Sequence, residues 1–308
     1  MGHRYTALVA YDILDKEVSD KILALLENHS HYDLHFKDQM PTEVRENAEL
    51  QKPWLFSQIA VWADVIKRKE LGYSPQHRNW HYINLPIFLT DTDERYYEDN
   101  MPNNLETDFK KGEKDSWNIA QAFGYNKQEI TSDKKANAAL AVCWIFHLMG
   151  DIHQPLHSTA LFNERRFIKG DLGGNTIKVK GLGVLHRQWD GVTYTKENEN
   201  WKFDEYVNFA HELRLKYEEE GLMAEKDILF EDWMNESHEL AKEVGYPKEL
   251  LEVIKESPIE KYGFSNPLVV KLGKDYTKQW KEQIVETSYK QITKAGYRLA
   301  YLMQNIFK

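Results

Sequence analysis

Two histidine–aspartate pairs stand out in the segment from residue 141 to residue 190. His147 and Asp151 are four residues apart, and His186 and Asp190 repeat this spacing. On a helix, residues four apart lie one above the other on the same face, so each pair can offer an imidazole and a carboxylate to one point. Nitrogen and oxygen donors of this kind are zinc ligands. The spacing therefore predicts a metal site.

A purely structural role for the first pair is the alternative. Residues 139–149 are apolar almost all round, which predicts a buried helix, and a lone histidine there is more often a hydrogen-bonded core residue than a ligand. Asp151 follows directly, however, and a buried carboxylate costs roughly several kcal/mol unless it is paired or coordinated. A cation accounts for both residues together, so we favour metal binding.

The composition limits the classes of protein to consider. The chain has 308 residues, 42% of them hydrophobic, and can bury a sizeable core. Its net charge of -9 argues against a protein that follows nucleic acid along a basic surface, but it permits a nuclease whose positive charge comes from bound metals. The single cysteine, Cys143, excludes an internal disulfide framework and is expected to be an inert core thiol. No stretch approaches the length of a transmembrane span, which predicts a soluble protein.

The first residues bear on where the protein works. Residues 1–4 lead straight into a helical pattern, without the hydrophobic segment of a signal peptide. The sequence therefore predicts either a cytosolic protein or the mature form of a chain that has lost its leader.

Helical hydrophobic periods predict the elements that position the candidate residues. They run from about 4 to 28, 54 to 69, 134 to 150, 203 to 220, 227 to 244 and 277 to 306. Pro155 ends or kinks the helix predicted over 134–150, which leaves His157 one turn beyond it. Residues 176–180 alternate and are the only convincing strand, expected in a small hairpin. Because no repeat or linker is present, we predict a single multi-helix, mainly α domain over residues 1–308.

The other segments are predicted to be irregular. Residues 29–52 form a polar loop followed by a helix start, residues 79–86 an aromatic-rich recognition loop ending at Pro86, and residues 87–112 a surface loop with a short helix. Five histidines are expected to be ordinary solvated residues: His29, His31, His35, His211 and His238.

Three segments outside the two pairs supply further residues of the ligand type. The candidate ligands are then His3, Asp64, His81, His147, Asp151, His157, His186 and Asp190. Five imidazoles and three carboxylates are too many for one tetrahedral zinc and fit a cluster of two or three ions. Spacing alone does not assign residues to individual ions, nor does it bring Asp64 and His81 to the others.

Six motifs resemble, in order, those of one protein family. They are Gly2-His3-Arg4, Trp62-Ala63-Asp64, Trp80-His81-Tyr82-Ile83, the segment from His147 to His157, the segment from Gly170 to Asn175, and the segment from Leu185 to Asp190. Residues 295–300 also resemble the last helix of that family. The family is that of the zinc-dependent, single-strand-preferring nucleases, the fungal S-one and P-one enzymes with plant and bacterial relatives. It is distantly allied to bacterial zinc phospholipase C.

The resemblance implies a mainly helical fold around a trinuclear zinc cluster. One ion would be bound by Asp64, His81, His147 and Asp151, and its close neighbour by His157, His186 and Asp190. Asp151 would bridge to a third ion, completed by His3 and by the amine and carbonyl of the first residue. His153 has no ligand role in this scheme and is expected to support the ligands or to pack.

The sequence departs from the family pattern at its beginning. The mature chains of the family begin with a tryptophan a few residues before the Gly-His pair, whereas Met1 stands here two residues before His3. Three Zn²⁺ ions are therefore implied if a leader and the tryptophan were trimmed, and two if the N-terminal site is incomplete.

The resemblance also implies which residues contact the substrate. Lys67, one turn after Asp64, matches a basic residue that contacts the phosphoryl group, so Asp64, Lys67 and Asp151 are the expected catalytic residues. Tyr82 and Asn84 match a nucleobase pocket, in which the ring stacks and the polar side chain reads the base edge. Asn84 stands where the fungal enzymes have an acid, and Asn175 is expected to line the same pocket. Without the resemblance, a solvated helix lysine and a turn asparagine are the simpler interpretations of Lys67 and Asn175.

These observations predict a zinc-dependent phosphodiesterase. Its expected substrates are single-stranded DNA and RNA, cleaved to 5′-phosphate products, and nucleotides, through a 3′-nucleotidase activity. The alternatives are a zinc-dependent phospholipase C and a metal-binding homologue with little activity because its N-terminal site is incomplete. By resemblance the protein is expected to be a secreted or periplasmic monomer, and a cytoplasmic location stays open because the sequence shows no signal peptide.

Overall fold

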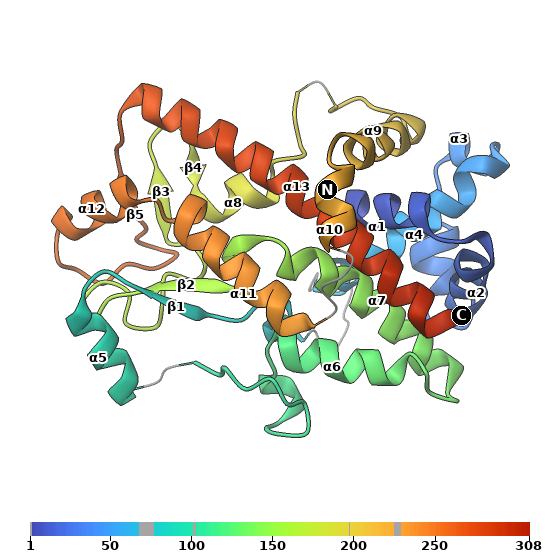
Figure 1. The fold of residues 1–308 in the computed structure, drawn as a ribbon, viewed down its shortest axis with the longest axis horizontal. Coiled ribbons are helices and arrows are strands. Elements are labelled where there is room, and N and C mark those ends of the chain that lie inside the picture. The colour runs from blue at the N-terminus through green and yellow to red at the C-terminus, as the bar shows by residue number, and fades with distance from the viewer. Residues whose placement is uncertain (1, 68–76, 101–102, 197, 225–228) are drawn as a thin grey trace.

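The fold is mainly α-helical with a few short strands, as the sequence predicts (Figure 1). The computed structural model describes residues 2–67, 77–100, 103–196, 198–224 and 229–308. The α-helices are α1 Gly2–Ile13, α2 Lys16–Leu26, α3 Thr42–Arg45, α4 Ala48–Val65, α5 Asp91–Asn100, α6 Ile119–Glu129, α7 Lys135–Ile152, α8 Leu185–Asp190, α9 Phe203–Lys216, α10 Glu218–Ala224, α11 Phe230–Leu240, α12 Lys248–Glu256 and α13 Lys274–Phe307. Short 3₁₀ or π turns are η1 Asp33–Lys37, η3 Arg78–His81, η4 Lys114–Ser116, η5 Pro155–His157 and η6 Ala241–Gly245.

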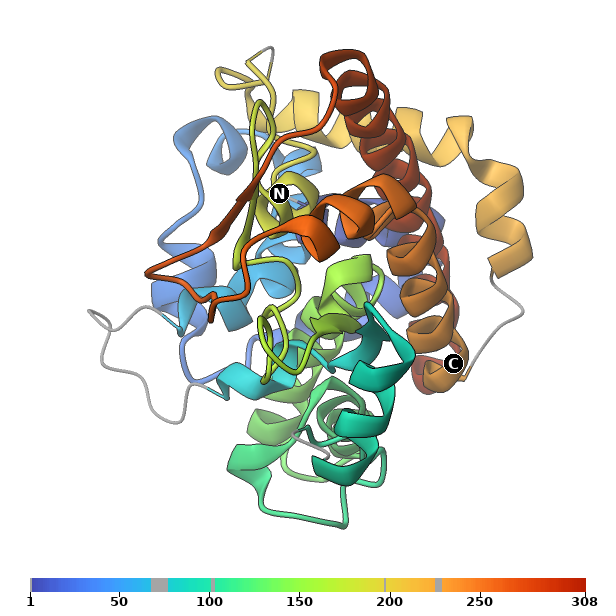
Figure 2. The same cartoon turned by 90° about the vertical axis from the view of Figure 1, so that its left-hand side faces the viewer.

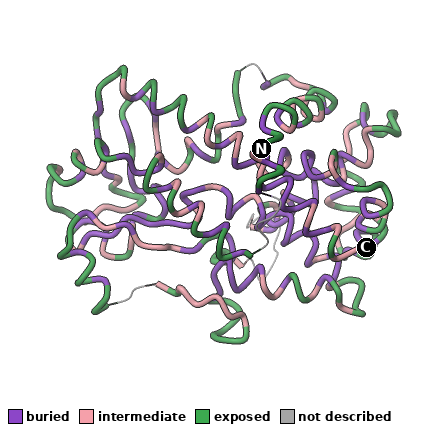
Figure 3. Tube along the Cα trace, in the orientation of Figure 1, coloured by how far each residue is buried: buried purple, intermediate pink, exposed green. Residues whose placement is uncertain are grey.

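Helices α1, α4, α7 and α13 pack against one another and form the main core. Helix α13 crosses most of the molecule in Figure 1, and the buried residues in Figure 3 concentrate where these four helices meet. Helix α1 approaches α13 closely at Gly296, where a Cβ atom would lie 2.6 Å from Val9 Cβ and 3.2 Å from Thr6 O. Only glycine permits this approach, which fixes α1, and with it His3, against the core.

Helix α7 is buried along almost its whole length because its side chains are apolar on nearly every face. It begins and ends within two residues of the predicted bounds. His153 caps it, and Gln154 then adopts an extended conformation with φ -91° and ψ 113°. A proline disfavours the α conformation in the residue before it, so Pro155 explains why the helix ends here.

Five short strands occur in the described residues, not the single strand predicted. The predicted hairpin is present, since β3 Ile177–Val179 pairs antiparallel with β4 Gly183–Val184. On its other edge β3 pairs in parallel with β5 Leu268–Val270, and a separate parallel pair joins β1 Leu85–Phe88 to β2 Thr159–Phe162. Figure 2 views the molecule from the side that carries these strands. The prediction missed β1 because Pro86 suggested an irregular loop, but the strand has β2 as its only partner and tolerates the proline.

Several predicted helices have different bounds in the structure. The helix predicted over 4–28 is two helices, because Asp15 leaves the helical conformation with ψ 141° while the hydrophobic period continues across the break. The helix predicted from residue 54 begins at Ala48, where Asn47 accepts a hydrogen bond from the Glu49 amide. The period over 203–220 is divided between α9 and α10 at Tyr217. Residues 68 and 69 of the second predicted helix, and 227 and 228 of a later one, lie outside the described residues.

Two helices were not predicted. Helix α6 begins with a capping box, in which the Asn118 side chain accepts from the amides of Ala120 and Gln121 and the Gln121 side chain accepts from the Asn118 amide. This Asn-x-x-Gln signal was present in the sequence. Helix α12 follows Pro247 and buries only Leu250 and Ile254, so its hydrophobic pattern is short.

Four of the five histidines predicted to be solvated are buried or half-buried. The His29 ring is only 3% exposed and lies 4.7 Å from Trp62 and 5.2 Å from Phe36 between ring centroids. His238 is half-buried, with Nδ1 2.9 Å from Thr159 Oγ1. His31 and His35 are also half-buried, whereas His211 is exposed as predicted and pairs with Asp12. Aromatic neighbours distant in sequence decide the burial of His29, so its polar local sequence was misleading.

The burial of His29 predicts an acid-dependent loss of stability. Burial, followed by the nearby His31 and His35, lowers the pKa of His29 from 6.5 to about 3. Below pH 6.5 His29 therefore binds a proton in the unfolded chain but not in the folded chain, and stability is lost as the pH falls. When the pH is lowered from 7 to 5, we expect the free energy of unfolding to decrease by about 2 kcal/mol less in His29→Phe than in the wild type. Urea unfolding of the metal-free proteins at both pH values measures this difference, and equal losses would refute it.

In the described parts of the chain, no helix combines the length and the apolar character that crossing a membrane requires. Cys143 is fully buried, and burial raises the pKa of its thiol well above 9.0, which agrees with the predicted inert role.

Candidate metal centre

All eight predicted ligands face one region between the helices. Helix α1 supplies His3, α4 supplies Asp64, and the turn η3 supplies His81. Helix α7 supplies His147 and Asp151, η5 supplies His157, and α8 supplies His186 and Asp190. Three groups of side chains, each with donor atoms within 4.8 Å of one another, together contain the whole set: His3-Asp64-His147, His81-His147-Asp151 and His157-His186-Asp190. The fold thus brings Asp64 and His81 to α7, which spacing alone did not require.

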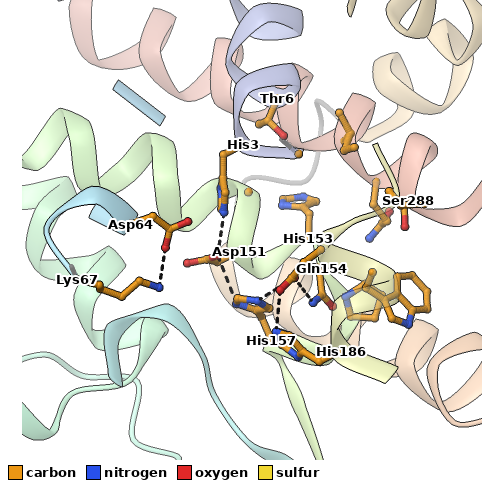
Figure 4. A pocket seen from close by; sticks show the side chains of 18 residues that line it. His3, Thr6, Asp64, Lys67, Asp151, His153, Gln154, His157, His186 and Ser288 are labelled. Atoms are coloured by element: carbon orange, nitrogen blue, oxygen red, sulfur yellow. Dashed lines mark hydrogen bonds and ion pairs between the residues drawn. The ribbon is translucent and has the colours of Figure 1, made fainter. Parts of the chain in front are cut away.

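Asp151 is the hub of the arrangement. Its Oδ2 atom lies 2.9 Å from His81 Nδ1 and 3.1 Å from His147 Nε2. Its Oδ1 atom lies 3.2 Å from His3 Nε2 and 3.3 Å from His157 Nδ1. The side chain is 2% exposed. One buried carboxylate is therefore shared by four imidazoles, two on each oxygen, and Figure 4 shows it between His3 and His157.

The second His–Asp pair lies beside this hub. His186 Nε2 is 3.3 Å from Asp190 Oδ2, and His157 Nε2 is 3.7 Å from Asp190 Oδ1. The rings of His157 and His186 are stacked, with centroids 5.0 Å apart. Gln154 donates from Nε2 to Asp190 Oδ1 at 2.9 Å and so holds the carboxylate in place. The predicted i, i+4 geometry of both pairs is realised on helices.

Backbone carbonyls orient three of the rings. The Nδ1 atoms of His147, His157 and His186 lie 2.7, 2.8 and 2.7 Å from the carbonyl oxygens of Ala60, His81 and Gly173. Each contact requires a proton on Nδ1, so in the neutral ring Nε2 carries the free lone pair. Ligand histidines in metal sites are held in this way by their other nitrogen.

The glycine-rich loop at residues 170–175 provides one of these carbonyls. Asp171 is fully buried and accepts hydrogen bonds from Gly174 N at 3.0 Å, Leu161 N at 2.9 Å and Tyr246 Oη at 2.8 Å. Burial raises the pKa of Asp171 to about 6. Gly173 adopts φ +59°, and a Cβ atom there would collide with Leu156 O. The loop is thus fixed so that the Gly173 carbonyl meets His186.

The electrostatics of the centre favour bound cations. Burial opposes ionisation of Asp64, Asp151 and Asp190, but the surrounding histidines outweigh it and hold the pKa of each carboxyl below its usual range. Burial lowers the pKa of His157, yet Asp151 and Asp190 outweigh it and raise the pKa to about 9. Burial lowers the pKa of His81 to about 4 despite its contact with Asp151. Three ionised carboxylates therefore lie close together, with Asp151 buried and the side chains of Asp64 and Asp190 46% and 49% exposed.

The donor set itself fits metal ions. His147 Nε2, which carries a lone pair, lies 2.9 Å from His81 Nδ1 and 3.6 Å from Asp64 Oδ1 as well as close to Asp151. Several electron-pair donors thus point at one place, an arrangement that a divalent cation satisfies. Sites rich in imidazole with some carboxylate suit zinc better than magnesium or calcium.

Of the predicted substrate-binding residues, all of which the structure describes, only Lys67 lines the metal cavity. Lys67 lines the same cavity, and its Nζ lies 2.6 Å from Asp64 Oδ1. Tyr82, Asn84 and Asn175 are not among the described residues that line this cavity. Tyr82 is 39% exposed and donates its hydroxyl to Asn79 Oδ1 at 3.0 Å, and Asn175 donates from Nδ2 to Leu172 O at 2.9 Å. A base pocket formed by these residues would lie outside the metal cavity.

His153 supports α7 from outside the set of ligands. Its Nδ1 lies 2.8 Å from Met149 O and its Nε2 lies 2.8 Å from Arg298 Nη1. Arg298 on α13 also binds Glu236 on α11 with Nη2 and Oε2 2.6 Å apart. This network was not predicted, because Glu236 and Arg298 are distant in sequence from the ligand motifs.

Comparison with known proteins agrees with this geometry. The family model described as S1/P1 Nuclease matches residues 1–308. The chain belongs to the S1/P1 nuclease family. Endonuclease 3 and Endonuclease 2 of Arabidopsis thaliana are 33% and 27% identical to it over 110 and 198 residues, which are 32% and 61% of this chain. Nuclease S1 of Aspergillus oryzae is 27% identical over 136 residues, or 43% of this chain.

These alignments cover 35%, 53% and 39% of the three relatives, so the chain matches about half of their length or less. Membership of the S1/P1 nuclease family confirms the resemblance on which the fold and the family were predicted.

Within this S1/P1 family member, Gly150 controls the position of His3. A Cβ atom at residue 150 would lie 3.0 Å from His3 Cε1 and closer still to Nδ1. We expect Gly150→Ala to displace the His3 ring and to weaken binding of the metal ion that His3 is predicted to ligate by about 10–100-fold. Zinc content after dialysis against a graded chelator measures the loss. Gly263→Ala, where a Cβ atom meets nothing within 4 Å, is the matched control. Equal zinc retention in the two variants would contradict the expectation.

Proposed function

We propose that this protein is a zinc-dependent phosphodiesterase that hydrolyses single-stranded DNA and RNA to 5′-phosphate products. We also propose a 3′-nucleotidase activity at the same site. The observation that carries the proposal is the convergence of five imidazoles and three carboxylates in three adjoining donor groups. Six of these eight residues line one cavity of about 250 Å³: His3, Asp64, Asp151, His157, His186 and Asp190. Membership of the S1/P1 nuclease family supports it.

Three zinc ions are proposed, with the assignment that the family resemblance implies. Asp64, His81, His147 and Asp151 would hold one ion, and His157, His186 and Asp190 its neighbour. Asp151 and His3 would contribute to the third, and the count falls to two if the first residue completes no site. The proximity of His3 to Asp151 supports the third assignment. Asp64 also has donor atoms within 4.8 Å of those of His3 and His147, which is compatible with a place between the first and third proposed ions.

Bound zinc would supply a Lewis acid and a water of lowered pKa for in-line attack on phosphorus. The chain supplies the rest. Lys67 places a cation at the edge of the cavity, where it can contact the non-bridging oxygens of a phosphodiester, and Asp64 holds its ammonium group. Asp151 fixes four imidazoles in one geometry, so the centre needs little rearrangement when substrate enters.

We further propose that a base stacks on Tyr82 and that Asn84 and Asn175 read its edge. The tether from Tyr82 Oη to Asn79 limits the motion of an exposed ring that follows His81 directly. Stacking on a ring is worth about 1–3 kcal/mol per base and accepts any sequence. A base must leave its duplex to stack there, which favours single strands.

The role proposed for Lys67 makes a kinetic prediction. We expect Lys67→Met to lower kcat on single-stranded DNA by about 100-fold, because one charged contact to the phosphoryl group is removed where charge develops. Zinc content should be unchanged, since Lys67 is not a ligand. Steady-state kinetics and metal analysis test both points, with the exposed Lys127→Met as control. A variant with wild-type kcat would exclude this role.

One assay distinguishes the proposed function from its alternatives. Zinc-loaded protein is incubated separately with single-stranded DNA, single-stranded RNA and phosphatidylcholine. Cleavage of both nucleic acids, with 5′-phosphate ends identified by mass spectrometry, is the expected result. Hydrolysis of the lipid alone would identify a phospholipase C. Bound zinc with cleavage of none of the three would identify a metal-binding homologue without turnover.

The setting of the protein is also proposed from the family resemblance. We propose a monomer whose residues 1–308 form one domain and which works outside the cytoplasm, in the periplasm or after secretion. Light scattering of the zinc-loaded protein tests the monomer, and a dimer mass would refute it. Fractionation of the source cells tests the location.

A further inference from the structure

The cavity of the metal centre has a second polar wall, away from the ligands. Helix α13 forms this wall with Ser288 and Gln291, three residues apart on one face. Lys67 and Asp64 line the opposite end of the cavity, and His3, Asp151, His157 and His186 lie between the two ends. Figure 4 shows Ser288 across the cavity from Lys67. A ligand that reaches α13 must therefore extend over the metal centre.

Both side chains carry buried polar atoms without a hydrogen-bond partner among the described residues. Gln291 is 3% exposed and Ser288 is 8% exposed, and neither Gln291 Nε2 nor Ser288 Oγ is hydrogen-bonded to another group in the part of the chain that the structure describes. Buried polar atoms in native proteins are nearly always satisfied, so two such atoms on one face of one cavity call for an external partner.

We propose that Ser288 and Gln291 bind the phosphate that neighbours the scissile phosphate in a single strand. This inference rests on the proposed nuclease function. An amide N–H₂ group can only donate and a hydroxyl can donate, so the partner must present acceptors. A phosphodiester of the strand presents acceptors alone, and its negative charge strengthens hydrogen bonds from such donors. The pair carries no charge and therefore does not attract every anion. It would distinguish strands from mononucleotides because a mononucleotide lacks the second phosphate.

The position of the pair predicts its consequence for specificity. Substrates with a phosphate on both sides of a nucleoside would contact the metal centre and α13 together, whereas a dinucleotide with one phosphate would contact the metal centre alone. A hydrogen bond to a charged group is strong enough to change affinity by about tenfold. The protein is thus expected to prefer a thymidine dinucleotide that carries an additional phosphate at the 5′ end, which the proposed 3′-nucleotidase activity does not remove, over the unphosphorylated dinucleotide.

The test compares Gln291→Leu and Ser288→Ala with the wild type and with Gln283→Leu, an exposed glutamine of the same helix. The wild type and Gln283→Leu should show a KM about tenfold lower for the 5′-phosphorylated dinucleotide than for the unphosphorylated one. The two wall variants should lose this preference and keep kcat and zinc content. Because Leu replaces an unsatisfied amide, the Tm of Gln291→Leu should equal or exceed that of the wild type. A purely structural role would lower the Tm and leave the preference intact.

A binding measurement separates this inference from the proposed function. Calorimetry uses the same dinucleotides with a methylphosphonate linkage, which resists hydrolysis, and zinc-loaded protein. If the wild type cleaves no nucleic acid but binds the terminally phosphorylated ligand more tightly than Gln291→Leu does, the nuclease proposal fails and the α13 phosphate site stands. If the wild type cleaves single strands but no variant alters the preference, the site is refuted. An equal loss of affinity for phosphorylated and unphosphorylated ligands would also refute it, since the pair would then contact a sugar or a base.

Discussion

Replacing Asp151 with Asn is expected to abolish metal binding at the centre and to lower nuclease activity by at least about 1,000-fold. The substitution keeps the shape of the side chain but removes the negative charge that four imidazoles share. It also replaces one oxygen by an NH₂ group, which cannot bind a cation. Because Asp151 is proposed to bridge two ions, more than one ion should be lost.

Metal analysis and kinetics on single-stranded DNA check this expectation. The exposed Asp204→Asn is the control for a loss of charge elsewhere. Circular dichroism of both variants establishes that the helices remain formed. If Asp151→Asn retained its zinc and cleaved within tenfold of the wild-type rate, the role proposed for Asp151 in metal binding and catalysis would be wrong.

Replacing Arg298 with Met is expected to cost about 3–5 kcal/mol of stability. Arg298 is 2% exposed and joins four helices, through His153 on α7, Glu236 on α11 and the Ala224 carbonyl on α10. Methionine fills much of the volume, so the loss is mainly that of the buried charge and its hydrogen bonds. Glu236 keeps its contact with Lys294 at 2.6 Å, which moderates the effect.

Urea unfolding of metal-free protein measures this cost. Lys278→Met, an exposed position of the same helix, is the control and should change stability by less than about 0.5 kcal/mol. If Arg298→Met matched the control, the network around His153 would not contribute to the stability of the core.

The candidate ligands that lie on a helix recognisable from its own sequence were the easiest to predict. The helix that carries His147 and Asp151 is apolar on nearly all faces, so both its burial and its bounds followed from the sequence. The second pair lies on α8, a helix of only six residues that no hydrophobic period could indicate. Its His–Asp spacing indicated it instead. The convergence of Asp64 and His81 on α7 depended on the family resemblance, because nothing local to either residue specifies the packing of α4 and η3 on α7.

Features set by long-range partners could not be predicted from local pattern. His29 has polar neighbours in sequence but aromatic ones in space. Strand β1 contains a proline and exists because β2, some seventy residues later, supplies its pairing. Gln291 and Ser288 resemble surface residues of an amphipathic helix in sequence, and only the position of α13 beside the metal centre buries them.

The distribution of the candidate ligands over six elements has a consequence for the lifetime of the protein. Residues from α1 to α8 would be tied together by the same ions, so every bound ion acts as a cross-link between segments far apart in the chain. A ligand that binds only the native form stabilises it by RT ln(1 + [L]/Kd), about 4 kcal/mol when zinc exceeds its Kd a thousandfold. Resistance to proteases would then follow the zinc supply of the surroundings, and surroundings that chelate zinc would both inactivate the protein and make it easier to degrade.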